Sequence, residues 1–533
     1  MMVALDAAAR SDARPRSMDL PIATVMGVIA LAVVLAPLFY VLVPPLTDYA
    51  NHLARMDIIA RLGQEPLLQR FYSIDWQVIP NLAMDIVVPP LVRVVGVFLA
   101  GKLFIAAIVV SIVTGTWALH RALHRAQHGP GGANALVAMA FTYNGIFLLG
   151  FTNFLFGIGL ALWGTAIRLS LRRQSHLRRL AASAATVLVL FFCHLFAVGL
   201  YGMAIFCLEA PALARMPWRR ALRHLGLMAL PFLVVFPLLA LSPTMGLADQ
   251  VVWSWVGKGE GLRFLVTTFH ETWEVRLGLV ALAVAVLLLV TRRMHLHVAG
   301  WMLLGTGAVT YIAMPTVLFG SAYADERLPV ALLFLGLGFV RFEFRTRWGR
   351  LAALAAILAV IVVRSVVMVG DWVPLGQIYK DMRASLTVVE PGSTILVAEA
   401  TVPTGDVNFN AAFSHAPCLA IIDRASLVST AFSVAGKQIL AVKPAYTGRV
   451  DREDGDPPST GDMMRAATGP APAVPAFWQN WRRDYDYVMV LNTEAGHREL
   501  TGLADLVHEG KGFQLYRVLH GDVPVAAGQA PAP

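Results

Sequence analysis

Long apolar runs, separated by short basic segments, make up most of the chain up to residue 369. A helix needs about 20 apolar residues to cross the hydrocarbon core of a bilayer. Judged against that length, the pattern predicts about eleven membrane-spanning helices. They are expected at residues 21–43, 100–119, 134–150, 152–170, 180–195, 198–213, 224–242, 277–291, 298–318, 327–340 and 350–369.

Residues 44–99, between the first two predicted spans, form a long loop with more polar positions. The stretch from Pro44 to Gly63 reads PPLTDYANHLARMDIIARLG and predicts a helix close to the membrane. The later stretch NLAMDIVVPPLVRVVG is interrupted by Pro89 and Pro90 and carries two charged side chains. It predicts a helix that lies along the membrane interface and does not span it.

The pattern changes at residue 370. Short apolar runs such as STILVAEA, CLAIID, DYVMVLN and FQLYRV alternate with polar, turn-rich stretches and predict buried strands. Residues 370–533 are therefore expected to form a separate α/β domain. Within it, residues 450–475 are rich in Pro, Gly, Asp and Thr and predict a flexible loop, and the final VPVAAGQAPAP predicts a disordered tail.

Composition agrees with a membrane protein and predicts its orientation. The chain is 57% hydrophobic and only 14% charged, whereas soluble proteins have about 25% charged residues. The net charge of +9 does not come from one basic patch, because the basic residues form short clusters between apolar runs, so no nucleic-acid partner is expected. By the positive-inside rule these clusters and the tail at residues 1–20 lie in the cytoplasm. Residues 44–99 and 370–533 then lie on the opposite side.

The two apolar runs around His194 could also form one broken helix. Merging them would place Arg292 and Arg341 on the face opposite the other basic clusters. The positive-inside rule therefore favours two separate spans.

Several ionisable residues are predicted on the outer side. Asp48, His52 and Arg55 are four and three residues apart, so on a helix they project from one face. The sequence GSAYADERLP adds Asp325 and Arg327 beside another span. Ionisable groups at membrane depth are costly and usually face a cavity or a partner. A carboxylate such as Asp48 can take a proton from a hydroxyl, and an arginine such as Arg327 can hold a phosphate, as sugar transfer from a lipid phosphate requires.

Four motifs resemble the GT-C superfamily of polytopic membrane glycosyltransferases, in its poorly characterised bacterial branch. They are the pattern Asp48-x-x-x-His52-x-x-Arg55 after the first span, GFTNFLFGIGLALW, CHLFA around His194, and DERLP from Asp325 to Pro329. The resemblance covers the membrane part of the chain. It implies a GT-C-like all-α membrane domain of about eleven helices, followed by the periplasmic α/β domain.

The resemblance also implies an activity, that of an inverting glycosyltransferase in the bacterial inner membrane. The donor would be a polyprenyl-phosphate-linked sugar, and the acceptor a periplasmic glycan, lipid or protein. By position, Asp48 would be the catalytic base, and Arg327 would contact the donor phosphate. The residues expected to bind substrate are His52, Arg55, Arg327, Asp325 and His194. Some members of the superfamily bind a divalent metal, but no second-carboxylate motif matches here, so the sequence names no cofactor.

Each candidate residue also has a structural interpretation. Asp48 can be a helix N-cap or a first-turn carboxylate favoured by the helix dipole. His52 and His194 can be buried, hydrogen-bonded histidines. Arg55 can meet lipid headgroups, and Arg327 can be an interfacial anchor or can pair locally with its acidic neighbours.

Two other functions stay open. A transporter or lipid-linked-sugar flippase would use the same charges as a pathway, but the paired broken helices of two related halves are not evident. A non-catalytic membrane scaffold would use the outer domain to bind partners. The asymmetric, long first loop favours the transferase.

Overall fold

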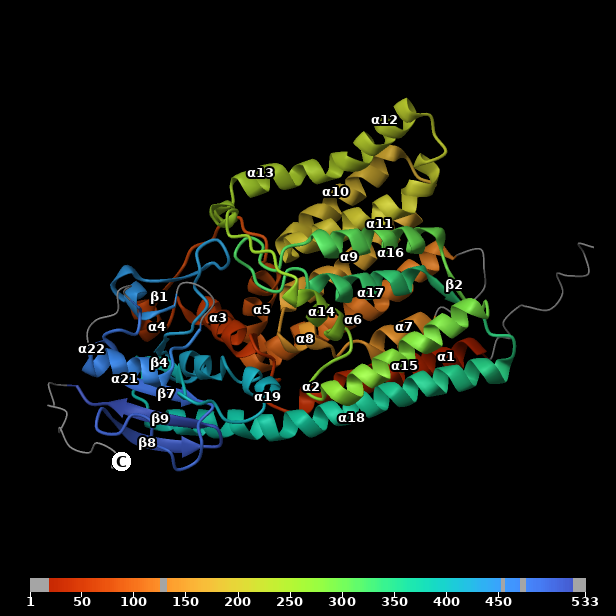
Figure 1. Cartoon of the computed structure of the whole chain (residues 1–533). Coiled ribbons are helices and arrows are strands. Elements are labelled where there is room, and N and C mark those ends of the chain that lie inside the picture. Colours follow the sequence, from red (N-terminus) through yellow and green to blue (C-terminus); the bar gives the residue numbers. More distant parts are fainter. Residues whose placement is uncertain (1–18, 125–131, 452–455, 470–475, 521–533) are drawn as a thin grey trace, which may run out of the picture. The chain divides into compact units, whose positions relative to one another are not determined.

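The computed structural model describes residues 19–124, 132–451, 456–469 and 476–520. The chain divides into two compact units, and Figure 1 labels the helices and strands of both. The first unit contains Met1–Tyr40, Val78–Met84 and Leu103–Gly370, and the second contains Val41–Gln77, Asp85–Lys102 and Asp371–Pro533. Most of the loop at residues 44–99 therefore shares a unit with the C-terminal segment. The basic tail up to residue 18 and the predicted disordered tail lie outside the described residues.

Apolar helices form the first unit. Among the described residues, seven helices are long and apolar enough to cross a membrane by length and composition. They are α6 (Val97–Leu123), α9 (Thr152–Ser170), α10 (His176–Cys193), α11 (Leu195–Leu213), the segment Trp218–Ala240 that contains α12 (Trp218–Ala229) and α13 (Val235–Ala240), α15 (Glu271–Val290), and the segment Arg347–Val388 that contains α18 (Arg347–Ser385). The shorter apolar helices are Thr24–Tyr40, which joins α1 (Asp19–Leu35) and α2 (Pro37–Tyr40), α16 (Val298–Ala313) and α17 (Arg327–Phe339). The chain is a multi-pass membrane protein, as predicted.

One predicted span is divided. Residues 134–150 form α7 (Gly132–Ala140) and α8 (Gly145–Leu148), so the prediction of one continuous helix is wrong. Asn144 explains the break, because its Oδ1 accepts the N–H of Phe147 at 3.0 Å and caps α8. Its Nδ2 donates to two carbonyls of the preceding turn. A side chain that competes for backbone groups in this way ends one helix and begins the next.

The structure separates α10 from α11 at His194, as the charge distribution favoured. His194 is extended, with φ −171° and ψ 134°, and its Nδ1 accepts the N–H of Phe196 at 3.2 Å. This bond caps the N-terminus of α11. Both helices pack against α9 and against each other.

Small residues bring α6 and α9 together. A Cβ added at Gly115 in α6 would lie 2.9 Å from the carbonyl oxygen of Gly159 in α9, so only glycine fits there. Small residues of this kind let membrane helices approach closely. The packing positions α9, which begins with Thr152, Asn153 and Phe154.

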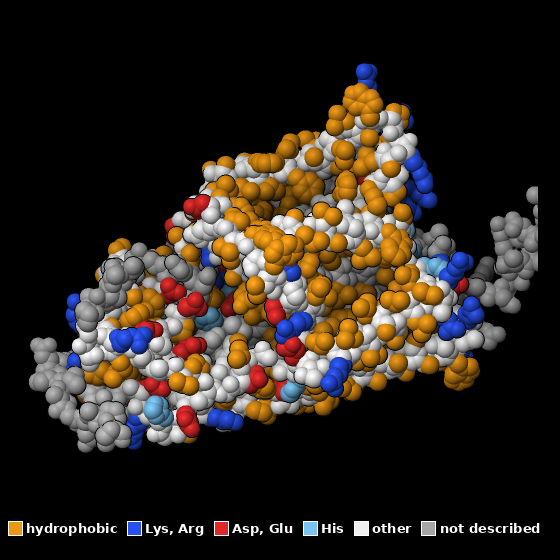
Figure 2. All heavy atoms as spheres, viewed as in Figure 1, with side chains coloured by type: hydrophobic (Ala, Val, Ile, Leu, Met, Phe, Trp, Pro, Cys, Tyr) orange, Lys and Arg blue, Asp and Glu red, His pale blue; other side chains and the backbone are white. Residues whose placement is uncertain are grey.

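Large apolar side chains cover the outer surfaces of several helices of the first unit (Figure 2). In α15, Leu279, Leu282 and Leu287 are 60–61% exposed. Exposed apolar surface of this extent is unfavourable in water but matches the hydrocarbon of a bilayer.

The second unit begins with the elements of the first loop. They are α3 (Tyr49–Arg61), α4 (Pro66–Phe71), β1 (Tyr72–Ile74) and α5 (Ala83–Val95). β1 pairs antiparallel with β6 (Leu440–Val442), and the hydroxyl of Tyr72 donates to the carbonyl of Ser426 at 3.0 Å. The first loop and the C-terminal segment are thus joined by backbone and side-chain hydrogen bonds within this unit.

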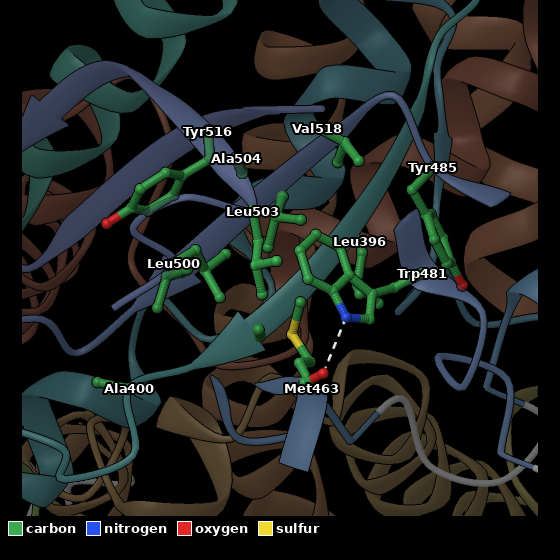
Figure 3. Packing of buried hydrophobic residues seen from close by; sticks show 13 residues of the cluster. Leu396, Ala400, Met463, Trp481, Tyr485, Leu500, Leu503, Ala504, Tyr516 and Val518 are labelled. Atoms are coloured by element: carbon green, nitrogen blue, oxygen red, sulfur yellow. Dashed lines mark hydrogen bonds between the residues drawn. The ribbon is translucent and has the colours of Figure 1, made fainter. Parts of the chain in front are cut away.

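A five-stranded sheet lies at the centre of the C-terminal segment. Its strands follow the order β5 (Leu427–Val428), β4 (Thr394–Glu399), β7 (Tyr487–Leu491), β9 (Phe513–Val518) and β8 (Ala504–Gly510). β4 is parallel to both neighbours, whereas β9 is antiparallel to β7 and β8. Alternate residues of the strands, including Leu396, Val488 and Tyr516, pack in one apolar cluster (Figure 3). There the indole N–H of Trp481 donates to the carbonyl of Met463 at 2.9 Å. The predicted α/β domain is confirmed.

One predicted strand of this domain is a helix. The run CLAIID forms a short 3-10 turn ending at Cys418, followed by α20 (Leu419–Arg424). A run of six residues is too short for periodicity to separate a strand from a helix. Within residues 450–475, Thr460–Thr468 form α21, whereas 452–455 and 470–475 lie outside the described residues.

Candidate functional site

Five of the six predicted site residues fall into two polar clusters, one in each unit, whereas Arg55 pairs with Asp85. The Asp48 cluster, in the second unit, consists of Asp48, Asn51, His52, His415 and Phe432. The Arg327 cluster, in the first unit, consists of Phe151, His194, Lys258, Asp325, Glu326 and Arg327. The structure thus brings Arg327, Asp325 and His194 together, and Asp48 and His52 together.

Asp48 directly precedes α3. Its backbone is helical, with φ −85° and ψ −8°, and its side chain makes no capping hydrogen bond. Asp48 thus occupies the N-cap position without capping α3 through its side chain, and a carboxylate favoured by the helix dipole stays its structural interpretation. The side chain is 19% exposed, so the carboxylate can meet a bound molecule.

His415 is a member of the Asp48 cluster that the sequence did not indicate. Its Nε2 lies 3.8 Å from Oδ1 of Asp48, and its Nδ1 lies 3.5 Å from Nδ2 of Asn51. The ring packs edge-on against Phe432, with ring centroids 4.7 Å apart. Burial lowers the pKa of His415 to about 4, so the imidazole is neutral at pH 7. Asn51 and His415 are 364 positions apart, and no local motif surrounds the histidine.

The other two residues of the α3 stripe are buried. His52 is 9% exposed and packs edge-on against Phe432, with ring centroids 6.0 Å apart. Arg55 is 1% exposed, and its Nε and Nη2 donate to the two carboxylate oxygens of Asp85 at 2.7 and 3.3 Å. This pairing with Asp85 and the burial of Arg55 leave no contact with lipid headgroups.

Arg327 is the first residue of α17 and is only 8% exposed. Its Nη2 donates to the carbonyl of Ala322 at 2.9 Å, and its Nη1 lies 3.2 Å from Nε2 of His194. The guanidinium carbon lies 4.1 Å from the centroid of the Phe151 ring. A buried arginine that stacks on an aromatic ring is held in one orientation, unlike an anchor that extends into solvent.

Two N–H donors face each other in the Arg327 cluster. Nδ1 of His194 accepts the N–H of Phe196, so it carries no proton, and the proton of the neutral ring is on Nε2. The N–H of Nε2 therefore faces an N–H of Arg327, at 3.2 Å. Two donors repel unless an acceptor joins them, and an anionic oxygen would accept from both.

The acidic residues before α17 are also buried. Oδ2 of Asp325 accepts from Nζ of Lys258 at 2.7 Å, and the side chain is fully buried. Burial, with Asp325 adding to it, raises the pKa of Glu326 to about 7. Within the described part of the chain, Oδ1 of Asp325 and Oε2 of Glu326 are buried without a hydrogen-bond partner. The resemblance implied that Asp325 binds substrate, whereas in the structure its carboxylate forms an ion pair with Lys258.

Asn153, from the GFTNF motif, has a structural contact in the first unit. Its Oδ1 accepts the N–H of Met84 at 2.8 Å, and its Nδ2 donates to the carbonyl of Asn81 at 2.8 Å. The asparagine thus binds both Asn81 and the first turn of α5. No three His, Cys, Asp or Glu side chains of the described residues are arranged to hold a metal ion.

Comparison with known proteins gave one solved structure. No protein-family model matches the chain, and a search of curated proteins found no match. The chain is similar to the crystal structure of ArnT from Cupriavidus metallidurans bound to undecaprenyl phosphate. The similarity covers 95% of this chain and 99% of that chain, at 13% identity and a TM-score of 0.47.

Proposed function

We propose that the chain is a GT-C-type inverting glycosyltransferase of the bacterial inner membrane. It transfers a sugar from a polyprenyl-phosphate-linked donor to a periplasmic glycan, lipid or protein. The observation that carries the proposal is the pair of N–H donors that Arg327 and His194 direct at each other. A buried pair of donors beside apolar helices fits the phosphate of a lipid-linked donor.

The reaction needs a base and a stabilised leaving group. The acceptor hydroxyl oxygen attacks the anomeric carbon from the face opposite the phosphate, and the carbon–oxygen bond to the phosphate breaks. The phosphate leaves with the bonding electron pair, as polyprenyl phosphate, and the configuration at the anomeric carbon inverts. The hydroxyl proton goes to the base. Negative charge grows on the phosphate, where N–H donors stabilise it most in the transition state.

Asp48 supplies the base in this proposal. Its carboxylate is 19% exposed, so a hydroxyl group of an acceptor can approach it. Arg327 and His194 supply the phosphate contacts. His52, Arg55 and Asp325 act through packing and ion pairs that hold these residues in place.

A reconstituted transfer assay tests the proposal. Purified protein in liposomes receives labelled undecaprenyl-phosphate sugars and an envelope extract as acceptor. We expect transfer by the wild type and none by Asp48→Asn with an unchanged melting temperature. Asp505→Asn, a change of an exposed aspartate in the second unit, is the matched control and should retain activity.

The outcomes separate the competing functions. Equal transfer by wild type and Asp48→Asn would exclude Asp48 as the base. Absence of transfer with every donor, together with movement of the labelled lipid across the liposome membrane, would overturn the proposal in favour of a flippase. Absence of both would favour a scaffold.

A further inference from the structure

The C-terminal segment contributes two side chains to the Asp48 cluster, His415 and Phe432. We propose that His415 is a positioning residue for Asp48, with its Nε2–H directed at the carboxylate by a hydrogen bond from Asn51 to Nδ1. The inference rests on the proposed function only where it treats Asp48 as the base. The imidazole–carboxylate pair itself is a property of the second unit.

Hydrogen bonds fix the orientation of the Asn51 amide. Its Oδ1 accepts the N–H of Phe432 at 3.0 Å, and its Nδ2 donates to the carbonyl of Thr430 at 2.8 Å. The Nδ2 group is therefore a donor where it meets Nδ1 of His415, at 3.5 Å. Because Nδ1 accepts, the proton of the neutral ring is on Nε2.

The Nε2–H then faces the carboxylate of Asp48. The distance from Nε2 to Oδ1 is 3.8 Å, slightly longer than a hydrogen bond. Catalytic hydrogen bonds are often long in the absence of substrate and shorten when it binds. A neutral N–H donor favours the ionised form of a carboxylate, so His415 would keep Asp48 able to accept a proton.

The surroundings keep the imidazole in place and neutral. Its ring packs against Phe432, which also contacts His52, and the side chain is only 10% exposed. The ionisable groups around it are Asp48 and His52 from α3, Cys418 from the following turn, and Tyr379 from α18, whose hydroxyl donates to the carbonyl of Ala412. Burial raises the pKa of Cys418 to about 12, so its thiol is also uncharged.

A second imidazole–carboxylate pair in the same unit provides a matched control. Nε2 of His508 lies 3.4 Å from Oδ1 of Asp381, and the ring stacks on Phe513 with centroids 5.7 Å apart. Like His415, His508 thus contacts one aspartate and one phenylalanine. It lies outside both polar clusters.

Carbodiimide labelling measures the pair without any assumption about activity. The reagent couples an amine to protonated carboxyl groups, and peptide mass spectrometry gives the extent at Asp48 and Asp381 from pH 4 to 8. Full-length wild type, His415→Phe, His415→Leu and His508→Phe are compared. The labelling midpoint is the pH at which half of a carboxyl group is labelled. In His415→Phe and in His415→Leu, the midpoint of Asp48 should move up by about 0.5 to 1 pH unit, because the Nε2–H donor of His415 is lost. His508→Phe should leave the Asp48 midpoint at the wild-type value, because His508 lies outside the Asp48 cluster.

His415→Gln keeps an N–H donor and should restore the Asp48 midpoint toward the wild-type value. Two replacements of different shape, Phe and Leu, allow a decision even if one of them does not fold. An Asp48 midpoint that is the same in wild type and in a folded His415 variant would overturn the inference.

Activity assays separate this inference from the proposed function. If both hold, the acid limb of the transfer rate moves to higher pH in His415→Phe by the same amount as the labelling midpoint. A moved midpoint in a protein that transfers no sugar would support the pair and contradict the proposed function. Transfer that depends on Asp48, with unmoved midpoint and pH profile in His415→Phe, would support the function and exclude the role of His415.

Discussion

Arg55 and Asp85 form an ion pair that is almost completely buried, with Nε of the arginine 2.7 Å from Oδ1 of the aspartate and both side chains 1% exposed. The pair joins α3, which begins directly after Asp48, to α5. The pair should contribute to the stability of the second unit. A buried charge that loses its partner remains desolvated without compensation, so Arg55→Met should lower the free energy of unfolding by about 3–5 kcal/mol.

Unfolding of the detergent-solubilised protein by denaturant measures this loss. Arg465→Met is the control, because Arg465 and Asp462 form a pair with side chains 73% and 40% exposed. Exposed pairs contribute about 0–1 kcal/mol, so the control should change little. Equal effects of the two substitutions would show that the Arg55–Asp85 pair is accessible to water.

Substitutions of Arg327 should show whether binding of a lipid phosphate depends on positive charge alone or also on the geometry of the guanidinium. Arg327→Lys keeps the positive charge but loses the planar fork and the stacking on Phe151. We expect the Kd for undecaprenyl phosphate to rise about tenfold in Arg327→Lys and further in Arg327→Met. Microscale thermophoresis in detergent measures the Kd. Arg341→Lys, at a partly exposed arginine of the first unit, should leave it unchanged. An unchanged Kd in Arg327→Met would exclude a phosphate contact.

Glu326 should make the stability of the first unit depend on pH. Burial and the adjacent Asp325 raise its pKa to about 7 in the folded protein, above the ordinary value of 4.5. The folded state therefore binds the proton more tightly than the unfolded state. The resulting stabilisation is complete below about pH 4.5 and is lost as the pH rises to about 7 and above.

Glu326→Gln removes this dependence because glutamine does not ionise. The melting temperature of the variant minus that of the wild type should therefore be larger at pH 8 than at pH 5. Glu494→Gln, an exposed glutamate in the second unit, is the control. A difference that does not change between pH 5 and 8 would show that the Glu326 carboxyl titrates outside this range.

The length of the apolar runs was sufficient to predict most of the membrane helices. It failed at Asn144, because the break there depends on one amide that binds backbone groups on both sides. Periodicity found β4, β7 and β9, but it could not distinguish the six residues of CLAIID from a strand.

The sequence predicted which residues belong to the polar clusters better than it predicted their contacts with one another. Helical spacing placed Asp48, His52 and Arg55 on one face, but it could not show that Asp85 pairs with Arg55. His415 contacts Asp48 only because the first loop and the C-terminal segment fold into one unit. Contacts between residues so distant in sequence depend on tertiary packing, which local propensity does not determine.

His194 has two contacts that substitutions can separate. Its Nδ1 caps α11 through the N–H of Phe196, whereas its Nε2–H faces Arg327. Asparagine is also a good N-cap, so His194→Asn should keep the cap while it loses the second donor. We expect its melting temperature to stay near the wild-type value and its affinity for undecaprenyl phosphate to fall.

His194→Ala loses both contacts. It should have the same weak affinity as His194→Asn and, in addition, a free energy of unfolding about 1 kcal/mol lower, because the cap is absent. Thermal unfolding and Kd measurements on the two variants separate these effects. If His194→Asn bound the lipid phosphate as tightly as the wild type, the Nε2–H would have no part in anion binding, and His194 would be a helix cap alone.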